Sequence, residues 1–446
     1  MTVNEKVTAF LARYGYMTGG PDIDSVIDGL LYDMQRSLDR ECGSSSVDGS
    51  EPMIPTWTNP PSGTPAGRSV IVIDAGGTNF RSCLVTFDSK GVPAVSCLEK
   101  TSMPGIEREY SKKEFFDAIA ENLEHLKNKA DTIGFCFSYA MQILPDGDGK
   151  VIEFSKEIQA EEVVGSCVGK SLSDALVEHG WKRPAKIILL NDTTAALLAG
   201  AVSVSAGRKY DSFVGFILGT GMNSAYIECG PIGKIAHTGD AKLKSQIVVC
   251  EVGSYNRVAQ SVFDVEVDNA SRFKGRFLIE KMCSGAYLGP AASSAVRHAC
   301  KDGLFSKQFA DAFTPVGHFE LMDMDKFLYA PYDSTTKLGA VAAAGTAEDY
   351  DILYMICDAI IERSARLASA VIAAAVIKSG KGSHPCMPVC VLCNGTTFHK
   401  THNLKPRIMG YLNRVLTEER HLYYDIVSMD NDITFGTAVA ALPSKN

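Results

Sequence analysis

The chain has 446 residues, a formal net charge of −8 at pH 7 and 46% hydrophobic residues, a composition typical of globular proteins. Its length exceeds what one core usually supports and favours two domains of about 150 to 250 residues each. Its acidic balance, with a pI of about 5.7, argues against nucleic acid as a partner, because neutralising phosphates requires clustered Lys and Arg.

Cysteine usage and the apolar segments indicate where the protein works. The 13 cysteines are scattered without the spacing of a disulfide framework, which is typical of reduced thiols in the cytosol. Residues 1–16 lack the basic and apolar regions of a secretory signal. The most hydrophobic later segment, 367–377, is too short to span a membrane and predicts a buried helix. We therefore expect a cytoplasmic protein without membrane insertion.

The N-terminal part predicts helices followed by a connector. Residues 1 to about 40 carry apolar side chains at helical spacing, for example Ile23, Ile27 and Leu30. Gly, Ser and Pro dominate residues 42–67, which marks a connector before the first strand.

Strands and helices alternate after the connector. The pattern predicts a strand-turn-strand unit over 70–88, a helix over 112–127, and strands over 131–140 and 186–192. A helical pattern follows the last of these strands. This alternation predicts an α/β fold.

A second strand-turn-strand unit spans 212–228 and parallels the first. FVGFILGTGMNSAYI matches VIVIDAGGTNFRSCLV in its order of features: an apolar run, a turn with Gly, Thr and Asn, and another apolar run. The repetition suggests two related halves of the chain. A Gly-rich turn between strands is also a common hairpin device, so the short match leaves that alternative open.

The two glycine turns are candidate phosphate sites. Glycine lets the backbone approach a ligand closely, and successive N–H groups can converge on an anion. The residues that would do this are Gly76, Gly77, Thr78 and Asn79 in the first turn, and Gly219, Thr220 and Gly221 in the second. Two tight hairpins without a ligand are the alternative. Asp74 favours the phosphate interpretation, because a carboxylate at the end of an apolar strand is costly to bury without a cation or hydrogen bonds.

Asp192 is the candidate general base. The apolar strand before it delivers the side chain to the carboxyl end of a strand, where α/β proteins gather their ligands. That position suits a base that takes a proton from an attacking hydroxyl group. An Asp that begins a helix can instead be a simple N-cap, and this alternative stays open.

Two further patterns predict no site. GSCVGKS, residues 165–171, is one residue short of a P-loop, and its Lys170 and Ser171 are interpreted as the start of a helix. His384, Cys386, Cys390 and Cys393 lack the spacing of a zinc site. Cys390 lies among apolar residues, and the segment predicts a buried strand.

Several motifs, taken in chain order, resemble those of the eukaryotic-type hexokinases, which belong with the sugar kinases, actin and the Hsp70-type ATPases. The residues that carry the resemblance are DAGGTNFR, GFCFSYA, FSKEI, LLNDTTA, FILGTGMNSAYIE, LIEKMCSGAYLGP and NGTTF. The resemblance runs from about Met53 to the end of the chain. Several motifs in the family's order identify the family more specifically than any single motif does.

The resemblance implies an α/β fold with two ribonuclease-H-like domains, the actin-like ATPase fold, and a cleft between the domains. The expected partition is an N-terminal helical segment and connector (1–62) packed on the large domain, a small domain (63–192 with 433–446) and a large domain (193–432). The implied activity is ATP- and Mg²⁺-dependent phosphorylation of a hexose, foremost D-glucose with mannose and fructose as other candidates. The 6-hydroxyl would receive the phosphoryl group, as in the first step of glycolysis. The oligomeric state, monomer or homodimer, stays open.

The resemblance also implies roles for individual residues. Asp192 is expected to be the base, and Lys156 is expected to stabilise charge near the transferring phosphoryl group. The expected sugar contacts are these two residues with Ser138, Ser155, Asn191, Asn223, Glu251 and Glu280. Asp74 is expected to serve Mg²⁺, and the expected nucleotide contacts are Asp74, Gly76, Gly77, Thr78, Asn79, Arg81, Gly219, Thr220, Gly221, Gly395 and Thr396.

The chain departs from the family pattern beside several of these residues. Ala140, Glu157 and Val252 replace the family's Pro, Gly and Trp, and the segment near Gly436 lacks the family's full Gly-Ser-Gly run. The polar groups survive, so the changes bear on which hexose is preferred. A catalytically weak hexose sensor and a nucleotide-driven ATPase are the alternative functions.

Overall fold

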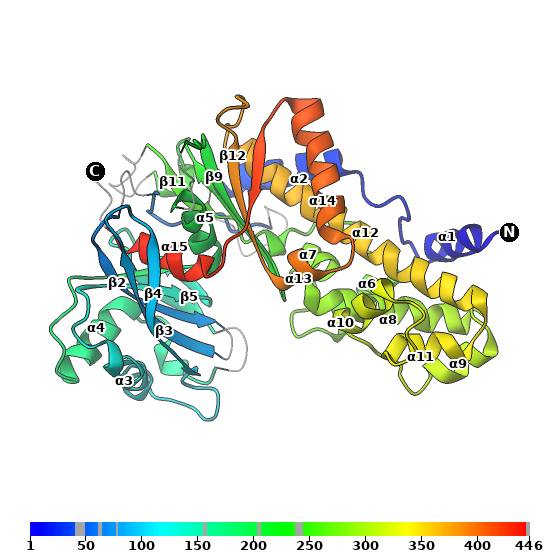
Figure 1. The fold of residues 1–446 in the computed structure, drawn as a ribbon, viewed down its shortest axis with the longest axis horizontal. Helices are drawn as coiled ribbons and strands as arrows, with labels where there is room; N and C mark the ends of the chain where they lie inside the picture. The colour runs from blue at the N-terminus through cyan, green and yellow to red at the C-terminus, as the bar shows by residue number, and fades with distance from the viewer. Residues whose placement is uncertain are drawn as a thin grey trace.

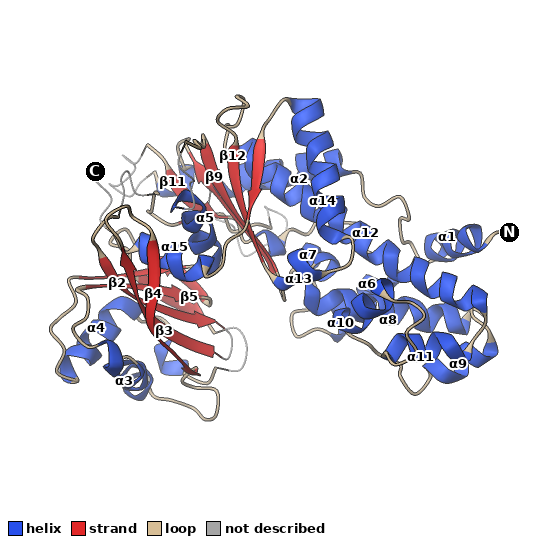
Figure 2. Ribbon diagram, in the orientation of Figure 1, coloured by secondary structure: helices blue, strands red, loops and turns tan. Residues whose placement is uncertain are grey.

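The computed structural model describes residues 1–40, 50–60, 65–76, 79–154, 158–202, 207–236 and 244–442. Two mixed β-sheets organise it, with helices packed around both (Figures 1 and 2). None of the helices in the described part is both long and apolar enough to cross a membrane.

The five-stranded sheet has the strand order β4-β3-β2-β5-β8, in which β2, β3 and β4 are antiparallel neighbours and β5 and β8 continue in parallel. Its strands are β2 (Ser69–Gly76), β3 (Asn79–Phe87), β4 (Pro93–Ser102), β5 (Thr132–Phe137) and β8 (Lys186–Leu190). A separate hairpin follows β5 and consists of β6 (Ala140–Ile143) and β7 (Gly149–Glu153).

The six-stranded sheet has the order β1-β11-β10-β9-β12-β13 and repeats the same topology, with β1 added at its edge. Its strands are β1 (Ile54–Pro55), β9 (Ser212–Leu218), β10 (Met222–Glu228), β11 (Gln246–Val249), β12 (Val389–Asn394) and β13 (Tyr424–Val427). In each sheet a hairpin and a third antiparallel strand are followed by two parallel strands. The predicted relation between the two halves of the chain is therefore visible in the strand order.

Strand β2 is buried on both faces, which explains its nearly continuous apolar sequence. Ile71 and Ile73 belong to a core with α3 (Lys112–Asn122) and α4 (Val168–Glu178). Val70 and Val72 belong to a second core with α5 (Asp192–Val202) and α15 (Asp432–Ala440), which also includes residues of β10 and β11. Helices α5 and α15 therefore lie between the two sheets (Figure 1).

Most of the remaining helices pack on the 32-residue helix α12 (Ala347–Lys378) or on helices that contact it. Helices α1 (Val3–Arg13) and α2 (Ile23–Asp39) pack on α12 and share its core. The others are α6 (Val262–Ala270), α7 (Leu278–Cys283), α8 (Gly285–Lys301), α9 (Lys307–Phe313), α10 (Leu321–Tyr329), α11 (Lys337–Ala344), α13 (Thr396–Lys400) and α14 (Leu404–Leu412). The packing of α1 and α2 supports the proposed assignment of residues 1–62 to the large domain, and the other domain boundaries also remain proposals.

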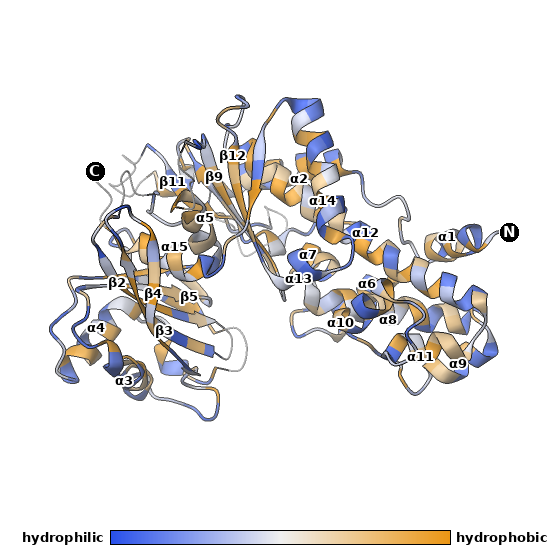
Figure 3. Cartoon of the chain, in the orientation of Figure 1, coloured by the Kyte–Doolittle hydropathy of each residue, from blue (hydrophilic) through white to orange (hydrophobic). Residues whose placement is uncertain are grey.

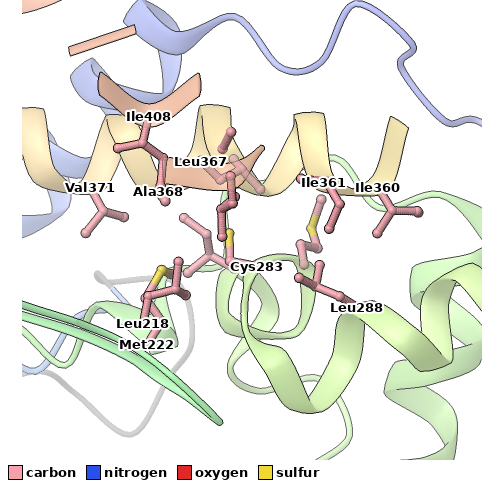
Figure 4. Close-up of a cluster of buried hydrophobic side chains, with 14 of the residues drawn as sticks. Leu218, Met222, Cys283, Leu288, Ile360, Ile361, Leu367, Ala368, Val371 and Ile408 are labelled. Atoms are coloured by element: carbon pink, nitrogen blue, oxygen red, sulfur yellow. The ribbon is translucent and has the colours of Figure 1, made fainter. Parts of the chain in front are cut away.

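The apolar segment 367–377 forms the C-terminal part of α12, as predicted. Its side chains Leu367, Ala368 and Val371 belong to the same buried cluster as Leu218 and Met222, which flank the second glycine turn (Figure 4). The core of the large unit thus supports this turn directly. Strand β12 is apolar along most of its length (Figure 3), and Cys390 and Cys393 are buried in it, as predicted.

Two predicted elements have different boundaries in the structure. The helix expected over 112–127 ends at Asn122, and a short 3₁₀ turn follows over Glu124–Leu126. In the P-loop-like segment, α4 begins at Val168, before the expected Lys170. The backbone N–H groups of Gly169 and Lys170 donate to the Asp148 carboxylate, so a protein side chain occupies the amides that a P-loop would offer to phosphate.

A buried ion pair connects three N-terminal and central elements. Arg363 of α12 and Asp264 of α6 are each 3% exposed, and the guanidinium donates two hydrogen bonds of 2.7 Å to the carboxylate. The Arg363 guanidinium also lies 4.5 Å from the ring centre of Tyr16, in the loop between α1 and α2. Burial alone would raise the pKa of Asp264, but the charge and hydrogen bonds of Arg363 outweigh it and lower the pKa.

We predict that Arg363→Met lowers the free energy of unfolding by about 3–5 kcal/mol, because it leaves a buried carboxylate without its cation. Chemical denaturation followed by circular dichroism would measure this. The matched control is Arg297→Met, which removes a half-exposed partner of Glu266 and should cost far less. Similar small losses in both variants would contradict the importance of the buried pair.

Candidate active site

Three polar side chains predicted to bind sugar meet beside the second glycine turn. Asn223 lies on β10, Glu251 follows β11, and Glu280 lies in the first turn of α7. The Asn223 amide donates to Glu251 Oε1 at 2.8 Å, and the backbone N–H of Met222 donates to Glu280 Oε2 at 2.9 Å. The structure therefore brings together residues that are far apart in the sequence.

Two glycines make room for the Glu280 carboxylate. A Cβ atom on Gly221 would lie 2.8 Å from Glu280 Oε2, and one on Gly253 would lie 3.1 Å from the same atom. Any larger side chain at Gly221 would displace the carboxylate. The second glycine turn thus has a steric role on the sugar side as well as its predicted role toward phosphates.

The Glu251 carboxylate is held at high electrostatic cost. Its pKa is raised to about 7, chiefly by burial and also by the charges of Asp192 and Glu280, while the Asn223 hydrogen bond opposes the increase. Glu251 also has a left-handed backbone, with φ of +53°, which is rare outside functional positions and turns. A polyol that donates hydroxyl hydrogen bonds would relieve this crowding of acceptors.

Asp192 lies at the start of α5, directly after β8. The side chain that caps this helix is that of the preceding residue: Asn191 Oδ1 accepts from the backbone N–H of Thr193 at 2.8 Å. Asp192 Oδ1 accepts from the Thr193 hydroxyl at 3.2 Å. The Asp192 charge raises the pKa of both Asp74 and Glu251, so Asp192 lies near the acids of both predicted subsites.

The first glycine turn brings together the predicted Mg²⁺ and phosphate residues. Asp74 and Gly76 end β2, and Gly76 pairs with Asn79 at the start of β3. Arg81 Nη1 lies 3.9 Å from Asp74 Oδ2. Burial raises the pKa of Asp74, Arg81 lowers it, and Asp192 and Asp432 raise it again. A divalent cation would fit this excess of carboxylate charge, with Asp74 as the residue that holds it.

Ser138 lies beside this turn. Its backbone N–H donates to the Ala75 carbonyl at 3.1 Å, and its hydroxyl lies 3.4 Å from where a Gly76 Cβ would be. The aromatic rings of Phe137, Tyr139 and Phe154 pack on one another. In the sequence, Phe154 directly precedes the segment that carries Lys156. Four predicted site residues, Gly77, Thr78, Ser155 and Lys156, lie outside the described residues, so their roles stay predictions.

The two turns predicted to contact nucleotide on the six-stranded sheet pack against each other. Gly395 has φ of +116°, and a Cβ there would lie 2.1 Å from the Leu218 carbonyl oxygen. The Thr397 hydroxyl donates to the Gly219 carbonyl at 2.8 Å, and the N–H of Gly285 donates to the same carbonyl. This contact places Gly395 and Thr396 beside the turn of Gly219, Thr220 and Gly221.

A cavity of about 470 Å³ opens next to Gly395. Its lining residues are Cys393, Asn394, His399, Ser428, Met429, Asp430 and Asp432.

Sequence reasoning missed Asp432, because an acid at the start of a helix is common and nothing in NDITFG distinguishes it. It also missed Thr397 and Gly285, whose roles depend on contacts with a distant turn.

Known protein families match both halves of the chain. Two family models described as hexokinase match residues 16–202 and 213–443. The chain is 27% identical over 398 residues to hexokinase-1 of Schizosaccharomyces pombe, covering 84% of this chain and 79% of that protein. It is 28% identical over 400 residues to glucokinase-1 of Kluyveromyces lactis, covering 81% and 82%.

The fold has a similar relative among solved structures. A hexokinase from Schistosoma mansoni complexed with glucose superimposes with a TM-score of 0.77, 22% identity and coverage of 98% of both chains. This similarity confirms the predicted two-domain α/β fold of the actin-like ATPase type. The two family models together span most of the sequence, and their match assigns the chain to a family. The chain belongs to the hexokinase family and is an enzyme of the hexokinase type.

Proposed function

We propose that the protein transfers the γ-phosphoryl group of MgATP to the 6-hydroxyl of a hexose, foremost D-glucose, and so carries out the first step of glycolysis in the cytoplasm. One observation carries the proposal: Asp192 begins α5 directly after β8, and its charge raises the pKa of both the sugar-side acid Glu251 and the phosphate-side acid Asp74. A base that joins an acceptor hydroxyl to a phosphate site needs that location.

The sugar side supplies acceptors for hydroxyl groups. Glu251 and Glu280 contribute carboxylate oxygens, each of which can accept more than one hydrogen bond, and Asn223 adds an amide. Hydroxyl groups of a correctly oriented hexose would donate hydrogen bonds to these acceptors. An epimer that leaves a buried acceptor unpaired would bind less well. The polar set supports a hexose, and the altered neighbours Ala140 and Val252 bear on which hexose fits best.

The proposed reaction is a direct displacement at phosphorus. Asp192 takes the proton of the 6-hydroxyl while that oxygen forms a bond to the γ-phosphorus, and the bond from the γ-phosphorus to the bridging oxygen of ADP breaks. Lys156 is proposed to offset charge on the transferring group. Mg²⁺, held through Asp74, would neutralise phosphate charge. The backbone amides of the two glycine turns would orient the phosphates.

The decisive test is coupled ADP release with MgATP and a panel of glucose, mannose, fructose, galactose and N-acetylglucosamine, with a no-sugar control. We expect turnover with glucose and little without sugar. Equal turnover without sugar would indicate an ATPase. No turnover, together with a melting temperature raised by glucose, would indicate a hexose sensor.

Asp192→Asn should lower turnover by about 10²- to 10⁴-fold, the usual contribution of a general base. Glucose affinity measured by calorimetry should change little, because the substitution keeps the shape of the side chain and Asn191 still caps α5. Asp117→Asn on helix α3 is the matched control and should retain full turnover. Near-normal turnover in Asp192→Asn would reject the base assignment.

Glucose affinity should increase with pH through the titration of Glu251. The pKa of about 7 means that roughly a tenth of this group is ionised at pH 6 and nine tenths at pH 8. Because the carboxylate is the form that accepts hydroxyl hydrogen bonds, binding should release a proton and be about tenfold weaker at pH 6 than at pH 8. Calorimetry in buffers of different ionisation enthalpy would measure both effects.

The control for this titration is Glu251→Gln, which should bind glucose more weakly and lose the pH dependence. An unchanged pH dependence in this variant would assign the titration to another group. A flat affinity profile in the unmodified protein would show that binding does not require the Glu251 carboxylate.

A further inference from the structure

A hydrogen-bonded pair joins the two halves of the molecule beside the nucleotide turns. Asn394 ends β12 of the six-stranded sheet, and Asp432 begins α15. The Asn394 amide nitrogen donates to both carboxylate oxygens of Asp432, at 2.8 and 2.6 Å. Asp432 is 5% exposed, so solvent screens this contact weakly.

The two members of the pair are anchored to different sheets. Asn394 is held in the ladder between β12 and β9, whereas α15 packs on β2 and β5 of the five-stranded sheet (Figure 1). The pair therefore spans the boundary on which α5 and α15 lie. A contact at this boundary resists relative movement of the two units.

Each member of the pair also lies next to a predicted nucleotide element. Asn394 directly precedes Gly395, which packs against the Leu218 and Gly219 backbone. On the other side, Asp432 is close enough to Asp74 for its charge to affect the Asp74 pKa. The pair thus connects the turn after β12 with the acid that is proposed to serve Mg²⁺.

The cavity lined by both residues favours the uncharged part of a nucleotide. Asp432 accepts from the amide nitrogen of Asn394, which leaves Asn394 Oδ1 as an acceptor. Asp430 and Asp432 add carboxylates, and the described residues that line the cavity include neither Lys nor Arg. Such a wall repels phosphate and can accept hydrogen bonds from hydroxyl or amino groups of a nucleoside.

We propose that Asn394 and Asp432 act together as a positioning pair for the nucleotide, which fixes the turn after β12 relative to α15 and Asp74. The inference rests on the proposed kinase function. Its physical basis is a charge-assisted hydrogen bond between the two units. If Asn394 became acidic, this hydrogen bond would be lost and two neighbouring carboxylates would repel each other. The pair should control nucleotide affinity and leave hexose affinity unchanged.

The test compares the two single substitutions with the exchanged pair. Asn394→Asp places two carboxylates in contact and should weaken MgADP binding and raise the KM for MgATP by tenfold or more. Asp432→Asn leaves two amides that can still form one neutral hydrogen bond, and it should weaken nucleotide binding about threefold. The double variant Asn394→Asp/Asp432→Asn restores a carboxylate-amide pair and should return both constants to within about threefold of the unmodified protein.

Asp117→Asn on helix α3 is the charge-matched control, because it removes one carboxylate that does not line this cavity and leaves the pair intact. Calorimetry with glucose and the melting temperature would show that each variant retains its sugar site and fold. An unfolded Asn394→Asp variant leaves Asp432→Asn and the double variant as the test.

Three results would overturn the pairing: no rescue in the double variant, equal effects of Asp117→Asn and Asp432→Asn, or parallel losses of glucose and nucleotide affinity. MgADP binding is measured without turnover, so it separates this inference from the proposed function. An inactive protein whose MgADP affinity follows the pair would refute the kinase activity and support the pairing.

Discussion

The candidate active site depends on several carboxylates that the fold holds close together and partly away from water. Asp74, Asp192, Glu251 and Glu280 come from four separate elements, and burial and mutual repulsion raise the pKa of Asp74 and Glu251. Such an arrangement would be unstable without compensating donors. The fold supplies the Asn223 amide and the Met222 N–H as donors, and the Arg81 guanidinium as a nearby positive charge. In the proposed function, a hexose and a magnesium nucleotide supply the rest.

The duplicated sheet topology explains how these groups meet. Each sheet starts with a hairpin whose turn carries glycines, and each continues with two parallel strands. Helices α5 and α15 lie between the sheets and share one hydrophobic core with strands of both. Asp192 at the start of α5 and Asp432 at the start of α15 consequently reach the boundary between the halves. The proposed base and the proposed positioning pair therefore both use a residue at the start of a helix that lies between the sheets.

Backbone geometry limits what evolution can place in the turns. Gly221 leaves room for Glu280, and Gly395 approaches the Leu218 carbonyl more closely than any residue with a Cβ could. The turns are also supported from below, because Leu218 and Met222 pack against the long helix α12 (Figure 4). A precise phosphate or sugar contact requires such support, since loosely held turns lose the geometry on which binding depends.

The sequence by itself determined the α/β class, the two related hairpins, the buried helix over 367–377 and the family, because apolar periodicity and ordered motifs are local properties of the chain. It also identified Asp192 as the candidate base, but it did not decide whether Asp192 instead caps the helix that follows. Only the tertiary structure decided that Asn191 is the cap, that Gly395 packs on the second glycine turn, and that Asn394 pairs with Asp432. These depend on contacts between residues far apart in the chain, whose distances no local pattern encodes.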